Sequence, residues 1–157
     1  MAKLSSERLL QLLEAALPGA LAEPSPDPPK PVVLKVPDVG RVRIYLWTTT
    51  PDQSARGRPA GEHKSQIIIG GTPKGSPQHL ELGDIPTFLM GYSPFYGVFV
   101  VWQAERHQDA GYSANLQVRV ELLEDANQSG WAIDKPRRTS LGQEVRALFI
   151  HRISLVI

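Results

Sequence analysis

The chain has 157 residues, of which 41% are hydrophobic and 21% charged, and this suffices for one globular domain with its own core. It contains no cysteine, which excludes disulfide bonds and thiolate-ligated zinc. No apolar run approaches the ~20 residues that span a bilayer, and polar side chains interrupt residues 1–17, so we expect a cytoplasmic protein without a membrane segment or a signal peptide.

The net charge of +1 predicts no polyanion partner, but the charges are distributed unevenly. Residues 35–75 hold seven basic and three acidic side chains, which gives this segment a charge of +4. The basic residues are Lys35, Arg41, Arg43, Arg56, Arg58, Lys64 and Lys74. A basic segment on a nearly neutral protein is typical of a surface that binds phosphate on one side, although scattered solvated charges give the same count.

The N-terminal part is predicted to be a helix and a linker. The helix begins with Ser6 as its cap and runs to about Leu17 with a broad apolar face. A Pro-Gly pair then stops it, and five prolines follow within eight residues, so residues 18–31 are predicted to be a semi-rigid linker. We therefore divide the chain into residues 1–31, whose helix docks on the domain or on a partner, and a β-rich domain over 32–157.

Beyond the linker the hydrophobic pattern has a period of two, which indicates strands. The segment 41–47 alternates between apolar and polar residues, which predicts a strand with one apolar face. Strands are predicted at Val32–Val36, 41–47, Lys64–Ile69, His79–Leu82, Thr87–Tyr92, Val98–Ala104 and Glu144–Ile150. One internal helix is expected from about Val118 to Gln128, with Gly130 as its left-handed C-terminal cap. The fold class is therefore mainly β with one or two short helices, arranged as an open barrel or a sandwich.

Two polar segments beside the predicted strands are rich in hydrogen-bonding groups and poor in acid. They span residues 56–66 and 106–119. Arginine pairs with guanine, glutamine and asparagine pair with adenine, and lysine binds phosphate, so these residue types are suited to the major groove of DNA. Ordinary surface loops share this composition, and Ser113 or Asn115 also suits the cap of the following helix.

The sharpest enzymatic pattern combines Asp52, Glu62 and Lys64, which match the PD-(D/E)xK signature of Mg²⁺-dependent nucleases. In that signature two carboxylates hold the metal, and the acidic-x-Lys element lies inside an apolar strand. Here a Gly/Pro-rich stretch precedes Glu62, which disfavours a strand interior. The four histidines show no helical metal-pair spacing, so no metal site is predicted in this domain.

The order of several short motifs resembles a known family. The residues that carry the resemblance are Glu62–Ile69, Phe88–Tyr92, Val98–Trp102 and a segment from Ser113 to Val118 that leads into a helix ending at Gly130. This order is similar to the B3-like, EcoRII N-terminal-type effector domains, which are DNA-recognition domains of bacterial restriction endonucleases. The likeness covers roughly residues 40–150.

The resemblance implies an open seven-stranded B3-like pseudobarrel, with two arms that grip the major groove and no nuclease chemistry in the domain itself. The family's arms would fall on the two polar segments. We therefore expect sequence-specific binding of double-stranded DNA, as the target-recognition domain of a type II restriction endonuclease in a bacterial restriction-modification system. The nuclease domain, with its Mg²⁺, would lie elsewhere in the chain or in a partner chain.

The predicted DNA-binding residues are the cationic, amide, hydroxyl and aromatic side chains of the two segments, together with two arginines of the strand 41–47. They are Arg41, Arg43, Arg56, Arg58, His63, Lys64, Gln66, Arg106, His107, Tyr112, Ser113, Asn115, Gln117 and Arg119. Two alternatives stay open: a small Mg²⁺-dependent nuclease that uses Asp52, Glu62 and Lys64, and a protein-interaction module that uses the N-terminal helix and the apolar C-terminal residues.

Overall fold

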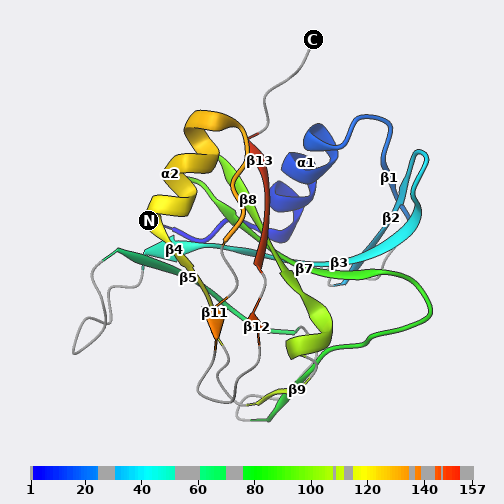
Figure 1. Cartoon of the computed structure of the whole chain (residues 1–157). Coiled ribbons are helices and arrows are strands. Elements are labelled where there is room, and N and C mark those ends of the chain that lie inside the picture. The colour runs from blue at the N-terminus through cyan, green and yellow to red at the C-terminus, as the bar shows by residue number, and fades with distance from the viewer. Residues whose placement is uncertain are drawn as a thin grey trace.

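A computed structural model describes residues 2–24, 31–51, 61–69, 76–107, 109–111, 115–134, 137–138, 144–145 and 147–152. Its centre is a six-stranded sheet in the order β1-β2-β3-β7-β8-β13 (Figure 1). Its strands are β1 (Leu21–Ala22), β2 (Val32–Val36), β3 (Gly40–Thr48), β7 (Thr87–Ser93), β8 (Val98–Gln103) and β13 (Ala147–Arg152). The β3–β7 pair is parallel and the other neighbours are antiparallel, so the sheet is mixed.

Smaller sheets complete the described part of the chain. A three-stranded sheet has the order β10 (Asn115–Arg119), β5 (Glu62–Gln66), β4 (Thr50–Pro51). Two-stranded sheets pair β6 (Gln78–His79) with β9 (Asp109–Gly111), and β11 (Arg137–Arg138) with β12 (Glu144–Val145). With α1 (Ser6–Ala16), α2 (Val120–Ser129) and the 3-10 turn η1 (Ala104–His107), the fold is mainly β with two α-helices, as predicted. The described strands form one mixed sheet and three smaller antiparallel sheets, and they do not close into a barrel.

Both faces of the six-stranded sheet are buried. Along β8, Val98, Val100 and Trp102 join one hydrophobic cluster with residues of α2, whereas Phe99 and Val101 join another with residues of α1. The prediction of a single apolar face for 41–47 is therefore wrong. Tyr45 and Trp47 are buried as well, because their polar atoms find partners: the Glu81 amide donates to the Tyr45 hydroxyl (3.0 Å), and Trp47 Nε1 donates to the Ile68 carbonyl (2.9 Å).

The N-terminal helix packs on this sheet. Leu9 and Leu13 of α1 are almost fully buried, in one cluster with the apolar side chains of β2 and β3. The Leu4 amide also donates to Thr48 Oγ1 (2.9 Å) at the end of β3. The cap is Ser5, whose hydroxyl accepts from the Arg8 amide, and not the predicted Ser6. Neither α1 nor α2 has the length or the apolar character that a membrane-spanning helix of the described chain would need.

The three-stranded sheet is joined to the six-stranded sheet at a tight junction. Thr49, between β3 and β4, donates its amide to the Tyr92 carbonyl (2.7 Å), and its hydroxyl lies 2.8 Å from that of Ser65 in β5. Both hydroxyls stand over Gly91 of β7, where a Cβ atom would collide with them. Glycine is therefore needed at this position for the two sheets to approach each other.

The segment before α2 is a strand, which corrects the prediction of a loop and of a helix from Val118. Asn115–Arg119 forms β10 and α2 begins only at Val120, so Asn115 is not the helix cap. The physical reason is that these five residues pair with β5, which provides hydrogen-bond partners along one edge of the strand. The C-terminal cap is confirmed, because Gly130 adopts a left-handed conformation (φ 88).

Candidate nucleic-acid interface

The two predicted polar segments meet in one pair of strands. β5 and β10 are antiparallel neighbours, and their register places Gln66 opposite Asn115, Lys64 opposite Gln117 and Glu62 opposite Arg119. These side chains alternate with buried ones, so all six point to the outer side of the three-stranded sheet. We call this surface the paired face; its residues are Glu62, Lys64, Gln66, Asn115, Gln117 and Arg119. Figure 1 shows β5 at one end of the molecule, far from β1 and β2.

The inner side of the same strands fixes the orientation of the paired face. Leu116 and Val118 are buried in the cluster that contains α2, and Ser65 is bonded to Thr49. Trp102 Nε1 donates to the Gln117 carbonyl (3.3 Å), which ties β10 to the six-stranded sheet. A shift of one residue in register would bury the polar set and expose the apolar set. The outward direction of the paired face is therefore strongly determined.

Carboxamides account for three of the six residues of the paired face. Gln66 and Gln117 are exposed and Asn115 is half-buried. Their side-chain amides make no hydrogen bond to another residue of the described chain. Each amide offers two N–H donors and one carbonyl acceptor, so the face presents unused donors and acceptors at fixed positions.

Arg119 is the best-defined cation of the paired face. Its Nη2 lies 2.8 Å from Asp134 Oδ1, with side chains 43% and 13% exposed respectively. Its Nε is shielded from solvent and has no hydrogen-bond partner among the described residues. Asp134 therefore holds the guanidinium at the end of β10, while a large part of the side chain remains open to a ligand.

Two arginines predicted to bind DNA lie elsewhere. Arg41 makes a bidentate ion pair with Glu23 (2.6 and 2.9 Å), and this hydrogen bonding lowers the pKa of Glu23. The guanidinium of Arg43 packs over Gly83, and its Nη1 donates to Thr87 Oγ1 (3.4 Å). Both residues are near the start of β3, and an extended chain of nine residues separates Arg41 from Thr50 by about 30 Å. The structure does not bring them to the paired face.

His63 is also set apart from the paired face. It lies on the inner side of β5, only 7% exposed, with its ring centroid 5.8 Å from that of Tyr96. Burial lowers the pKa of His63 below its usual 6.5, and Nδ1 has no partner within the described chain. The alternation along β5 that exposes Lys64 is what turns His63 inward, so it is a packing residue in this structure.

The remaining predicted residues are only partly described. His107 is half-buried in η1. The side chain of Arg106 lies outside the described part of the structure, as do Arg56, Arg58, Tyr112 and Ser113. All of them belong to segments that lead along the chain into β5 or β10.

The nuclease alternative receives limited geometric support. Glu62 and Lys64 share the outer side of β5, but Asp52 lies outside the described residues. In register, Glu62 lies opposite the cationic Arg119, and a positive charge so near disfavours a metal cation at this position. Within the described chain, no three His, Asp or Glu side chains gather in a way that could hold a metal.

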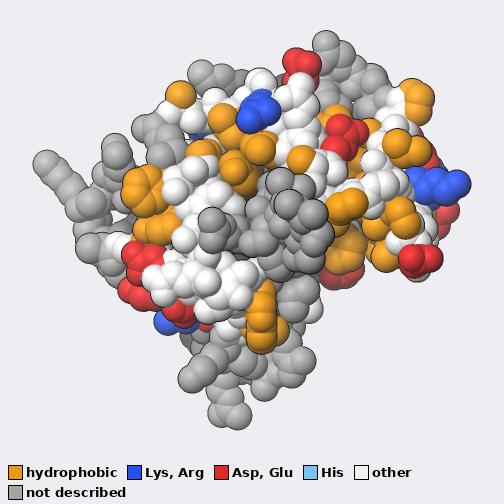
Figure 2. All heavy atoms as spheres, turned by 90° about the horizontal axis from the view of Figure 1, so that it is seen from above, with side chains coloured by type: hydrophobic (Ala, Val, Ile, Leu, Met, Phe, Trp, Pro, Cys, Tyr) orange, Lys and Arg blue, Asp and Glu red, His pale blue; other side chains and the backbone are white. Residues whose placement is uncertain are grey.

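Acidic residues mark the helix next to the paired face. Glu121, Glu124 and Asp125 of α2 are exposed. Figure 2, seen from above, shows red side chains at several edges of the visible face, with orange hydrophobic side chains between them. A polyanion that approached over α2 would be repelled, so this charge favours approach from the side of the strands.

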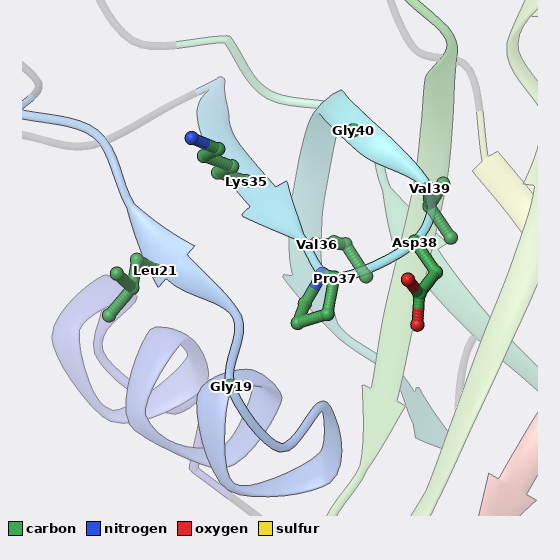
Figure 3. Close-up of a pocket in the computed structure, with 8 residues that line it drawn as sticks. All are labelled: Gly19, Leu21, Lys35, Val36, Pro37, Asp38, Val39 and Gly40. Carbon is green, nitrogen blue, oxygen red and sulfur yellow. The ribbon is translucent and has the colours of Figure 1, made fainter.

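A hollow of about 510 Å³ lies far from the paired face, at the turn between β2 and β3. Figure 3 shows Leu21 and Lys35 on one side of it and the Pro37–Val39 turn on the other. Its lining is mostly apolar, and two of its eight described lining residues, Lys35 and Asp38, are charged. It offers no convergent set of polar groups comparable with the paired face.

A comparison with protein families shows to which family the chain belongs. The model of the methylase-associated X1 family matches residues 40–153 of the 157. The chain belongs to this family. Methylase-associated X1 domains are found in restriction-modification systems. The matched span contains both β5 and β10, whereas α1, β1 and β2 precede it. No curated protein and no solved structure matches the chain.

Proposed function

We propose that this methylase-associated X1 chain binds duplex DNA through the paired face, as a non-catalytic target-recognition domain of a restriction-modification system. The observation that carries the proposal is the register of β5 and β10, which gathers two polar segments into one outward surface. The membership of a family found in restriction-modification systems supports a DNA-related role. The chemistry would belong to a nuclease domain, with its Mg²⁺, in the same or a partner chain.

The dimensions of the paired face suit the major groove. Two neighbouring strands are about 4.8 Å apart, and a two-stranded ribbon fits a groove about 12 Å wide. Successive outward residues of one strand are about 6.8 Å apart, which corresponds to two base-pair steps. Side chains on the three cross-strand pairs would therefore span about four base-pair steps, or about five consecutive base pairs.

The segments that lead into the two strands would extend this contact. Arg56 and Arg58 precede β5, and Arg106, His107, Tyr112 and Ser113 precede β10. We propose that they form the two arms that reach along the groove and to the phosphates, and that the sheets form the B3-like pseudobarrel that the sequence resembles. Arg41 and Arg43 would contact DNA only if the duplex extended along β3.

The proposal is tested by titrating a fluorescently labelled duplex with the full chain and measuring anisotropy at several salt concentrations. Affinity should fall steeply with salt because bound cations release counterions. Lys64→Ala should weaken binding and reduce the salt slope by about one if Lys64 contacts a phosphate. Lys35→Ala, which removes an exposed lysine of β2, is the control and should leave both quantities nearly unchanged. Equal effects of the two variants, or no binding at low salt, would refute the proposal.

The nuclease alternative is tested in the same samples by adding Mg²⁺ and looking for cleaved product. We expect none from this chain. Cleavage that disappears in Glu62→Ala would replace the binding proposal with a catalytic one.

A further inference from the structure

The paired face is unusually rich in one functional group. Gln66, Asn115 and Gln117 are carboxamides, and they belong to two adjacent cross-strand pairs, Gln66–Asn115 and Lys64–Gln117. A carboxamide matches the major-groove edge of adenine, because its N–H donates to N7 while its carbonyl accepts from N6. No other base presents this donor and acceptor pattern in the groove.

We infer that the paired face recognises adenine in duplex DNA, and that methylation of adenine at N6 blocks this recognition. The inference rests on the proposed function and adds to it the base that is read and the modification that is sensed. It follows from the residue types and the register of the two strands. Lys64, directly opposite Gln117, and Arg119, two residues further along β10, would add contacts to phosphate or guanine.

The chemistry of the adenine edge explains the sensitivity to methylation. The N6 amino group has two hydrogens, and one of them pairs with thymine. Only the other is available to a carboxamide carbonyl in the groove. A methyl group in the paired base must replace this second hydrogen, so it removes the donor and occupies the place of the carbonyl oxygen. Methylation of cytosine at C5 leaves the adenine edge unchanged.

The positions of the three carboxamides support discrimination between adenine and N6-methyladenine. The backbone of Gln117 is held by Trp102, and the neighbouring Leu116 and Val118 are buried. A strand whose backbone is held in this way cannot move aside easily to accept a methyl group, and its backbone loses little further entropy on binding. A methylase associated with such a domain would produce the mark that the domain excludes.

The experiment uses duplexes that the full chain selects from a randomised, unmodified library. Each selected adenine is replaced in turn by N6-methyladenine or by 7-deazaadenine, which lacks the N7 acceptor. We expect both replacements at the recognised adenines to weaken binding about 5- to 150-fold, the range of one bidentate base contact. Replacement of cytosine by 5-methylcytosine next to those adenines is the matched control and should have little effect on the adenine contact.

Variants connect the effect to the paired face. Gln117→Ala and Asn115→Ala should bind more weakly and lose much of the difference between methylated and unmethylated duplexes. Gln128→Ala, at an exposed glutamine of α2, should retain that difference. Thermal unfolding of each variant verifies that it is folded, and Gln117→Met preserves the bulk of the side chain if the alanine variant is unstable.

The outcomes separate the inference from the proposed function. If the chain binds selected duplexes but tolerates both adenine modifications, or prefers the methylated duplex, the inference is wrong and the proposed function stands. A selected site that contains no adenine would likewise show that the inference is wrong and leave the proposed function standing. If no duplex is bound at low salt, the proposed function itself fails.

Discussion

The hydroxyl groups of Thr49 and Ser65 lie 2.8 Å apart in a fully buried position, where the six-stranded sheet passes into the three-stranded sheet. This contact sets the position of β5 relative to β3 and β7, and therefore the direction in which the paired face points. Gly91 makes the contact possible, because any larger residue would fill the space that the two hydroxyls occupy.

We expect Gly91→Ala to destabilise the protein by about 1–3 kcal/mol, because an added methyl group in a packed junction forces neighbouring atoms apart. The free energy of unfolding in urea measures the effect. Ser65→Ala should cost about 1–3 kcal/mol, since it leaves the buried Thr49 hydroxyl without this partner. Ser129→Ala, at an exposed position of α2, is the control. Unchanged stability in both junction variants would show that the sheets are not joined in this way.

The N-terminal helix provides a second test, because it precedes the span matched by the family. Leu13 is 1% exposed in the cluster between α1 and the sheet. We expect Leu13→Ala to destabilise the whole protein by about 2–5 kcal/mol, in a single unfolding transition. Leu21→Ala, which truncates a leucine that is 69% exposed in β1, should have little effect. If Leu13→Ala left the stability unchanged, α1 would not be part of the folded core.

Because His63 is buried, we expect the protein to lose stability in mild acid. Burial lowers its pKa in the folded protein below the usual 6.5, so the unfolded chain binds a proton more readily than the folded chain. The stability that this residue contributes is complete above about pH 6.5 and decreases as the pH falls toward the folded pKa, by at most about 1.4 kcal/mol per pH unit. Urea unfolding of the wild type and of His63→Gln between pH 7.5 and 5 measures the difference.

The His63→Gln variant should lose part of this pH dependence. His79→Gln removes an exposed histidine and should keep it. The same pH profile in all three proteins would contradict the burial of His63.

Much of the fold was predictable from the sequence. The elements that were predicted correctly have strong local sequence patterns, whereas the others depend on contacts between residues that are distant in the chain. β2, β3, β7 and β8 show strong local patterns, and the left-handed cap at Gly130 follows from a single residue. β10 also has a local signal, since Leu116 and Val118 alternate with polar residues, but Val118 and Leu122 equally fit helical spacing. Only the pairing with β5 resolves the ambiguity.

The candidate site shows the same limit. The sequence identifies two polar segments, but Gln66 and Asn115 are 49 positions apart and their direct pairing is a tertiary fact. The outward or inward direction of each side chain depends on that pairing. For this reason Lys64 and Gln117 belong to the paired face, whereas His63 between Glu62 and Lys64 does not.

The last prediction compares two ion-paired arginines that differ in position. Arg119 is held by Asp134 on the paired face, and Arg41 is held by Glu23 at the other end of the molecule. Arg119→Ala should weaken duplex binding by about 1–3 kcal/mol if the guanidinium contacts a base, whereas Arg41→Ala should change it little. Anisotropy titrations of both variants at one fixed salt concentration measure the difference. Thermal unfolding of each variant verifies that a change in affinity does not come from a loss of folding. A larger loss of affinity in Arg41→Ala would place the DNA along β3 instead of over β5 and β10.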